Sequence, residues 1–148
     1  MRRIAAIVLA LAATACAAPV PEGLGVRDGR LAPCPESPNC VSSDARDSTH
    51  RTDPLRYEGD PAAAWAAARR AVEALPRTVV AESSDDYLRA ETTTPLMRYV
   101  DDLELHLRAD RGEIAVRSAA RVGWSDMGTN RERVWELRRA FGSQRVTD

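Results

Sequence analysis

The clearest hydrophobic pattern in the chain is an alternation across residues 98–108, which is typical of a β-strand with one buried and one exposed face. The apolar positions are Leu103, Leu105 and Leu107, and the polar positions are Asp102, Glu104, His106 and Arg108. A second strand-like run, 114–121, follows the turn-forming residues 110–112. Together the runs predict a β-hairpin in which Ile114 and Val116 share the core face with the leucines, while the charged residues form a solvated outer face.

Helical spacing appears on both sides of this hairpin. Residues 61–75 are rich in alanine, with Asp60 as a capping residue before them and Pro76 as a stop after them. The apolar stripe of this helix is Trp65, Ala68, Val72 and Leu75. A second helix is expected from Thr129, where Thr129 and Glu132 match a capping box. Its apolar stripe is Val134, Leu137 and Phe141, and Gly142 is its expected end.

Shorter runs complete the predicted fold. Residues 78–83 and 87–92 are strand-like and are separated by a polar turn, and residues 55–57 could form a further short strand. The order of elements predicts an α+β domain, a two-layer sandwich in which an antiparallel sheet of about four strands packs against two helices. Residues 23–56 contain many turn formers and no sustained periodicity, so we expect an irregular segment before the sandwich.

Three cysteines, Cys16, Cys34 and Cys40, are present in the chain. A structural disulfide between Cys34 and Cys40 is the expected state of the last two, because a loop rich in Pro, Ser and Asn separates them. Free thiols are the first alternative. A metal or redox site is the second, although the spacing is not Cys-x-x-Cys and no convincing further ligands are nearby.

The beginning of the chain has the composition of an export signal. Arg2 and Arg3 precede an apolar run over residues 4–13, which is too short to span a bilayer. Small residues then lead into Cys16, as in a lipobox, although Ala13 stands where leucine is usual. Ordinary cleavage after Ala15 or Ala17 is the alternative. We therefore expect a signal peptide over residues 1–15, a lipidated tether over 16–24, one domain over 25–143 and a disordered tail over 144–148.

Composition excludes some functions and limits others. The net charge is −1, which argues against bulk binding to nucleic acid. The chain contains no lysine, so any anion site must be built from arginine. It also contains no phosphate-binding loop, dinucleotide fingerprint, zinc signature or nucleophile elbow, and we expect no cofactor and no metal.

The densest polar stretch joins the last predicted strand to the last predicted helix. Arginine side chains beside a helix N-terminus can form an anion site. The candidate ligand-binding residues are Asp101, Arg117, Ser118, Arg121, Asp126, Asn130 and Arg131. The structural alternative is a connecting loop in which Asp126 and Asn130 cap the helix and the arginines pair with Asp101 and Asp102. Asp101 falls on the apolar face, so it either pairs with an arginine at the strand end or is turned outward by a bulge.

These residues also carry a resemblance to a known family. Residues 25–43, with the run Cys34-Pro35-Glu36-Ser37-Pro38-Asn39-Cys40, are similar to the opening signature of the domain of unknown function family 1499. Asp101-Asp102-x-Glu104 and residues 117–133 resemble its later signature, except that Ala120 stands where serine is usual. The resemblance covers about residues 25–141. It implies a bacterial envelope protein, often lipidated, and no known activity.

Two functional hypotheses follow. The first is a non-catalytic envelope lipoprotein, facing the periplasm from the outer membrane, whose arginine-rich site binds an anionic ligand or an envelope protein. Its contact with the membrane is the lipid anchor, and no nucleic acid is involved. The second is a small hydrolase-like enzyme that uses Asp101 or Asp126 as a general base.

Overall fold

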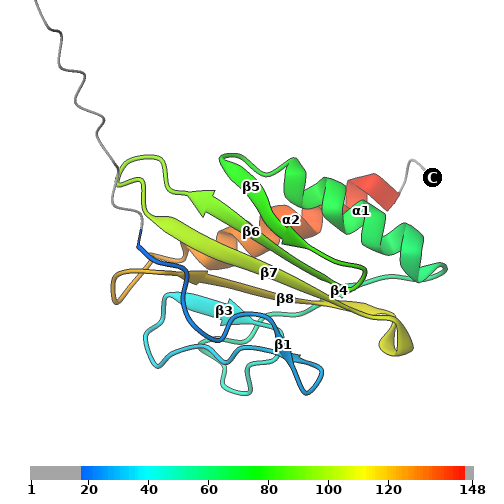
Figure 1. Cartoon of the computed structure of the whole chain (residues 1–148), viewed down its shortest axis with the longest axis horizontal. Coiled ribbons are helices and arrows are strands. Elements are labelled where there is room, and N and C mark those ends of the chain that lie inside the picture. Colours follow the sequence, from blue (N-terminus) through cyan, green and yellow to red (C-terminus); the bar gives the residue numbers. More distant parts are fainter. Residues whose placement is uncertain (1–17, 146–148) are drawn as a thin grey trace, which may run out of the picture.

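Figure 1 shows a computed structural model of the chain, which describes residues 18–145. In chain order the elements are β1 (Val26–Arg27), β2 (Arg30–Leu31), β3 (Cys40–Ser42), β4 (Leu55–Arg56), α1 (Pro61–Glu73), β5 (Thr78–Ser83), β6 (Tyr87–Thr93), β7 (Val100–Arg108), the 3-10 helix η1 (Ala109–Arg111), β8 (Glu113–Ala120) and α2 (Thr129–Arg145). The α+β class is confirmed. The predicted signal peptide and Cys16 lie outside the described residues.

The main sheet has six strands, and all of its strand pairs are antiparallel. Its order is β3-β8-β7-β6-β5, and β4 also pairs with β8. The four long strands are the predicted ones, but the expectation of about four strands was too low. Of the two additional strands, β4 lies where residues 55–57 were expected to form a short strand, and β3 is three residues long, too short to show an alternating pattern.

Both helices cover one face of this sheet and pack against each other (Figure 1). Helix α1 begins as predicted, because the Asp60 carboxylate accepts a hydrogen bond from the Ala63 amide at 3.0 Å and Pro61 occupies the first turn. The predicted apolar stripes are buried in the core, except that Trp65 is only partly buried at its edge. Leu103, Leu105, Ile114 and Val116 supply the sheet side of that core.

Helix α2 differs from its prediction at both ends. Asp126, rather than the expected pair of Thr129 and Glu132, caps it: the Asp126 carboxylate accepts hydrogen bonds from the amides of Gly128 and Asn130 at 3.0 and 2.8 Å. The helix also continues through Gly142, because glycine interrupts a helix only where the chain turns into the left-handed conformation. The first two residues of the predicted tail therefore belong to α2, and residues 146–148 lie outside the described residues.

The second face of the sheet is also covered, which the sequence pattern did not predict. Glu104 is fully buried and His106 is 7% exposed, although both were expected on a solvated face. The covering segment, residues 18–39 with the β1–β2 hairpin, lies across this face as a third layer together with the loop after β3 (Figure 1). The two-layer description is therefore incomplete, and the polar side of β7 is an interior surface.

The covering segment is held by two local features. The Cys34–Cys40 disulfide is formed and ends where β3 begins, which confirms the predicted bridge. The strands β1 and β2 form a hairpin whose turn residues, Asp28 and Gly29, both have positive φ angles of 51° and 70°. An Asp-Gly pair favours this type of turn. Leu31, which follows the turn, packs in a small apolar cluster between the layers.

Candidate functional site

The buried polar face is organised around paired charges, and the first group surrounds Asp102. Arg121 donates two hydrogen bonds to the Asp102 carboxylate, from Nε at 2.7 Å and from Nη2 at 2.8 Å. Nη2 also donates to Glu91 at 2.6 Å, and Arg89 donates to both acids at 2.8 and 3.0 Å. The hydrogen bond to Asp102 is the largest cause of a raised pKa for Arg121, and the hydrogen bonds from Arg89 and Arg121 lower the pKa of Glu91.

Arg121 also reaches the start of the described chain. Its Nη1 donates to the backbone carbonyl of Ala18 at 2.9 Å. The residues predicted to form a tether are therefore attached to the sheet at this point. All three of its nitrogens donate to protein acceptors and only 4% of its side chain is exposed, so Arg121 is engaged within the domain rather than presented to a ligand.

The second group surrounds Glu104. One carboxylate oxygen accepts hydrogen bonds from the Gly25 amide at 2.8 Å and the Tyr87 hydroxyl at 2.9 Å. The other accepts a hydrogen bond from Arg117 at 3.0 Å, and Arg117 in turn lies 3.5 Å from the Pro33 carbonyl. Glu104 and Arg117 therefore bind the backbone of the covering segment at two separate positions.

The third group joins the far end of β7 to the loop after β3. Arg108 donates to the Asp44 carboxylate at 2.6 Å, and the same carboxylate oxygen accepts from the Leu31 amide at 2.9 Å. Burial alone would raise the pKa of Asp44, but the hydrogen bonds from Arg108 and Leu31 outweigh it and the pKa is lowered. His106 lies between these groups, its Nδ1 has no hydrogen-bond partner, and burial lowers its pKa.

Asp101 is on the opposite face of the sheet, beneath α2. It pairs with Arg133, whose Nη2 donates to it at 2.7 Å, so the first of the two predicted options for Asp101 is correct. Arg133 also donates to Ser118 at 3.0 Å and to Asn130. Ser118 donates to Asn130 at 2.6 Å, which ties β8 to the first turn of α2. Burial is the largest influence on Asp101 and raises its pKa.

The predicted site residues therefore do not converge. Asp101, Ser118, Asp126 and Asn130 lie together on the helix side, where Asn130 bridges to Asp126 at 2.8 Å. Arg117 and Arg121 lie on the other face, with the sheet between the two groups. Arg131 is separate from both and donates to the backbone carbonyls of residues 49 and 51 at 2.7 and 3.0 Å.

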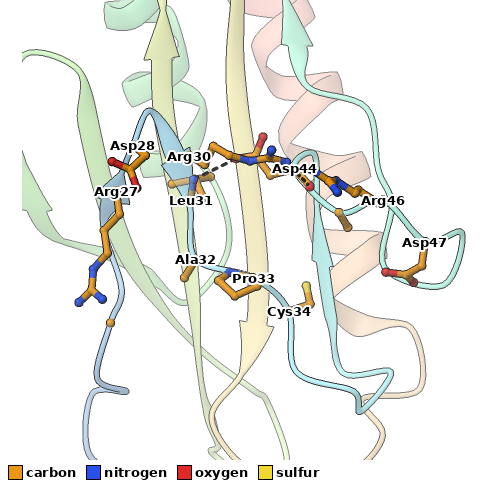
Figure 2. Close-up of a pocket in the computed structure, with 12 residues that line it drawn as sticks. Arg27, Asp28, Arg30, Leu31, Ala32, Pro33, Cys34, Asp44, Arg46 and Asp47 are labelled. Carbon is orange, nitrogen blue, oxygen red and sulfur yellow. Dashed lines mark hydrogen bonds between the residues drawn. The ribbon is translucent and has the colours of Figure 1, made fainter.

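An open cavity of about 470 Å³ lies beside the β1–β2 hairpin of the covering segment (Figure 2). It is bounded by the β1–β2 hairpin, by residues 32–34 and by the loop after β3. Its charged lining residues are Arg27, Asp28, Arg30, Asp44, Arg46 and Asp47. Figure 2 shows Arg27 and Arg46 on opposite rims, with Pro33 and Cys34 between them. The Asp-Gly turn was the only sequence signal for this hairpin, and its consequence for a cavity could not be anticipated.

Charges around the cavity are unequally satisfied. Asp44 is paired with Arg108, and Asp47 accepts a hydrogen bond from the His50 amide at 3.0 Å and lies 2.8 Å from its ring Nδ1. Among the described residues, Arg27 and Arg46 form no salt bridge, and both are exposed. Asp28, which also lines the cavity, forms no salt bridge among the described residues either, so the surplus of unpaired charge at the cavity is small and positive.

Within residues 18–145, no group of three or more potential ligands is arranged to hold a metal ion. The same part of the chain contains no helix with the length and hydrophobicity needed to cross a bilayer.

The fold and its internal charge pairs define a small α+β domain whose sheet is covered on both faces. The chain belongs to the family described as "Protein of unknown function (DUF1499)", whose model matches residues 30–141, about three quarters of the sequence. No curated protein matches the chain. The family match begins at β2 and ends in α2, so it includes the disulfide and the buried acids and arginines on both faces of the sheet.

Proposed function

We propose that this protein is a non-catalytic binding module of the bacterial cell envelope, anchored by a lipid at Cys16, and that it binds an anionic group in the cavity beside the β1–β2 hairpin. The observation that carries the proposal is the difference between its arginines. Arg117 and Arg121, from the later family signature, are engaged by protein acceptors. Arg27 and Arg46 form no salt bridge among the described residues and line a cavity. An arginine-rich anion site is thus retained as a hypothesis but moved to different residues.

The binding hypothesis is favoured over the hydrolase alternative by the surroundings of the two candidate bases. Asp101 is 2% exposed and paired with Arg133, so a substrate would have to displace that guanidinium. Asp126 accepts hydrogen bonds from the backbone at the start of α2 and from the Asn130 side chain. Neither carboxylate lines the cavity, which is where a ligand has room.

The ligand chemistry follows from the guanidinium groups. Arginine presents planar donors that suit carboxylate and phosphate oxygens. Arg30 retains part of this capacity, because only its Nη2 is engaged, by the Asp44 carbonyl at 2.9 Å. Asp28 on the hairpin turn and Asp47 on the loop after β3 also line the cavity, so the anionic group is expected at the guanidinium groups themselves and not across the whole cavity (Figure 2).

Export and anchoring rest on the sequence of the first 16 residues. Two arginines, a short apolar run and small residues before Cys16 are the features of a lipoprotein signal. Ala17 and Ala18, the two residues after that cysteine, are not aspartate, which favours the outer membrane under the usual sorting rule of Gram-negative lipoproteins.

The test uses the full precursor expressed in a Gram-negative host and purified from the envelope. Its denatured mass reports acylation of Cys16, and its native mass reports any retained anionic molecule. The binding residues are tested with the double variant Arg27→Gln/Arg46→Gln, and Arg111→Gln serves as the control because that exposed arginine lies on η1, away from the cavity. NMR titration with inorganic phosphate measures binding directly.

The proposal predicts phosphate-dependent shifts in the amides of residues 27–34 and 44–47, which the double variant loses and the control keeps. Identical titrations for all three proteins would overturn the binding site. An unmodified Cys16 in the denatured mass would overturn the lipid anchor independently of the binding result.

A further inference from the structure

Large exposed apolar side chains gather at one end of the domain. The loop between β6 and β7 and the loop between β8 and α2 both lie at the end of the sheet where β7 begins and β8 ends. Together these loops expose Leu96 (91%), Met97, Tyr99, Val122, Trp124 (69%) and Met127 (97%). Among the described residues, only Val26, Val79 and Trp135 are comparably exposed apolar side chains at other positions, apart from Val20 near the chain start.

The backbone of these loops exposes the apolar side chains at a conformational cost. Arg98 and Met127 have φ angles of 53° and 54°, in the left-handed region that non-glycine residues rarely adopt. Met127 precedes Gly128, at φ 84°, and its side chain has almost no contact with the rest of the domain. Internal packing of Met127 does not account for this arrangement, which is typical of a surface that contacts something else.

The start of the described chain lies at the same end. The hydrogen bond from Arg121 to the Ala18 carbonyl holds the start of the described chain next to the residue that follows β8, and Figure 1 shows that start at the same end of the sheet as the β6–β7 loop. Cys16 precedes Ala18 by two positions, so at most about 7 Å of extended chain separates them. A lipid on Cys16 would therefore bring the bilayer surface to these loops.

The residue types suit a lipid surface. Tyr and Trp are enriched at the level of lipid headgroups, where their rings are partly apolar and partly hydrated. Apolar groups that bind at this interface enter it by about 5–10 Å, a depth that the tips of two loops can reach. Arg98 is exposed between Met97 and Tyr99 and would meet anionic headgroups.

We infer that this end of the domain docks onto the lipid bilayer, with the β6–β7 and β8–α2 loops inserted in the interfacial layer and the opposite end, with α1's first turn, directed away from the membrane. The inference rests on the lipid anchor of the proposed function for its geometry. Docking gives the anchored domain a fixed orientation, in which the cavity with its arginines lies away from the loops that enter the bilayer.

Tryptophan fluorescence tests this orientation. In the full chain, Trp65→Phe/Trp135→Phe leaves Trp124 as the single tryptophan. Trp65 is the matched control, left alone in Trp124→Phe/Trp135→Phe, because its indole donates to the Ser84 carbonyl at 3.3 Å, in the β5–β6 turn at the other end of the sheet. Envelope-purified proteins are reconstituted into phosphatidylethanolamine–phosphatidylglycerol vesicles with brominated acyl chains, which quench tryptophans that enter the bilayer.

Docking predicts that Trp124 emission shifts to shorter wavelength and is largely quenched, whereas Trp65 emission is unchanged. Leu96→Asp/Met127→Asp should restore most of the Trp124 emission, and Val79→Asp, at an exposed position on β5, should not. An unquenched Trp124 in protein whose mass includes acyl chains overturns the docking surface while leaving the anchor intact. Concentration-dependent dimerisation with unquenched Trp124 would instead assign the surface to a second copy of the chain.

The docking surface can also be tested if Cys16 is not acylated. If the mass includes no acyl chain, the same protein is mixed with preformed vesicles. Quenching of Trp124 there would support docking by the loops alone, and no quenching would overturn it.

Discussion

Replacement of Arg121 by glutamine distinguishes a structural arginine from a ligand-binding one. The Arg121 and Asp102 side chains are 4% and 1% exposed, and two hydrogen bonds of 2.7 and 2.8 Å join them. Removing one partner of a buried pair costs about 3–5 kcal/mol because the other charge stays buried. Arg89 still contacts Asp102 at 3.0 Å, so we expect a loss near the lower end, about 3 kcal/mol.

Urea denaturation measures this loss. With a typical dependence of about 1–3 kcal/mol per molar urea, a loss of 3 kcal/mol lowers the unfolding midpoint by about 1–3 M. Arg98→Gln is the control, since that arginine is exposed and should change the free energy of unfolding by less than about 0.5 kcal/mol. Adding Asp102→Asn to Arg121→Gln should cost less than the two single losses combined, because each residue compensates the other's charge.

The reasoning would be refuted if Arg121→Gln unfolded within about 0.5 kcal/mol of the wild type. That result would mean that the guanidinium is solvated and available, as in a ligand site or a weak surface ion pair worth about 0–1 kcal/mol. Because Arg121 also holds the Ala18 carbonyl, the variant should in addition show faster amide exchange at the start of the domain.

Three further predictions concern other parts of the structure. Replacing Cys34 and Cys40 by serine should lower the free energy of unfolding by about 2 kcal/mol, measured by urea denaturation, because the disulfide restricts a short loop of the unfolded chain. The pKa of His106 is below 6.5 in the folded state, so the unfolded chain binds more protons in this range; stability should fall as the pH drops below about 6.5, and His106→Leu should reduce that fall between pH 7.5 and 5.5. Ala120→Ser should place a hydroxyl directly opposite Asp101, raise stability by about 1 kcal/mol and lower the pKa of Asp101 in an NMR titration.

The sequence was most informative where one side-chain period persisted over many residues. The alternation through Leu103 and Leu105 predicted β7 correctly, and the helical spacing of Val134 and Leu137 predicted the buried side of α2. Neither pattern depends on distant parts of the chain, because burial of one face is sufficient to produce it. The position of Asp101 on the apolar face was also apparent, but its partner Arg133 comes from another element and could not be selected among several arginines.

The covering layer could not be predicted for a different reason. Its attachment depends on backbone groups, such as the Gly25 amide on Glu104 and the Pro33 carbonyl near Arg117, and a backbone group has no signature in a sequence. A charged strand face is normally solvated, so Glu104 and His106 were assigned to solvent on the commoner pattern. The outcome differs because each buried carboxylate on this face has its own guanidinium or backbone donor.

The later family signature, residues 101–104 and 117–133, therefore has a physical explanation that does not require a ligand. A charge that is buried without a partner costs several kcal/mol, so the acids of β7 and the arginines in and directly after β8 depend on each other. Substituting either side of such a pair is costly even when no function is lost. A ligand, by contrast, needs donors that the protein has left unoccupied, and Arg27 and Arg46 beside the cavity meet that condition. Within the motif, Arg117 and Arg121 attach the N-terminal layer to the sheet, and Asp126 and Asn130 hold the start of α2. We therefore expect binding at the surface that the N-terminal layer presents to solvent.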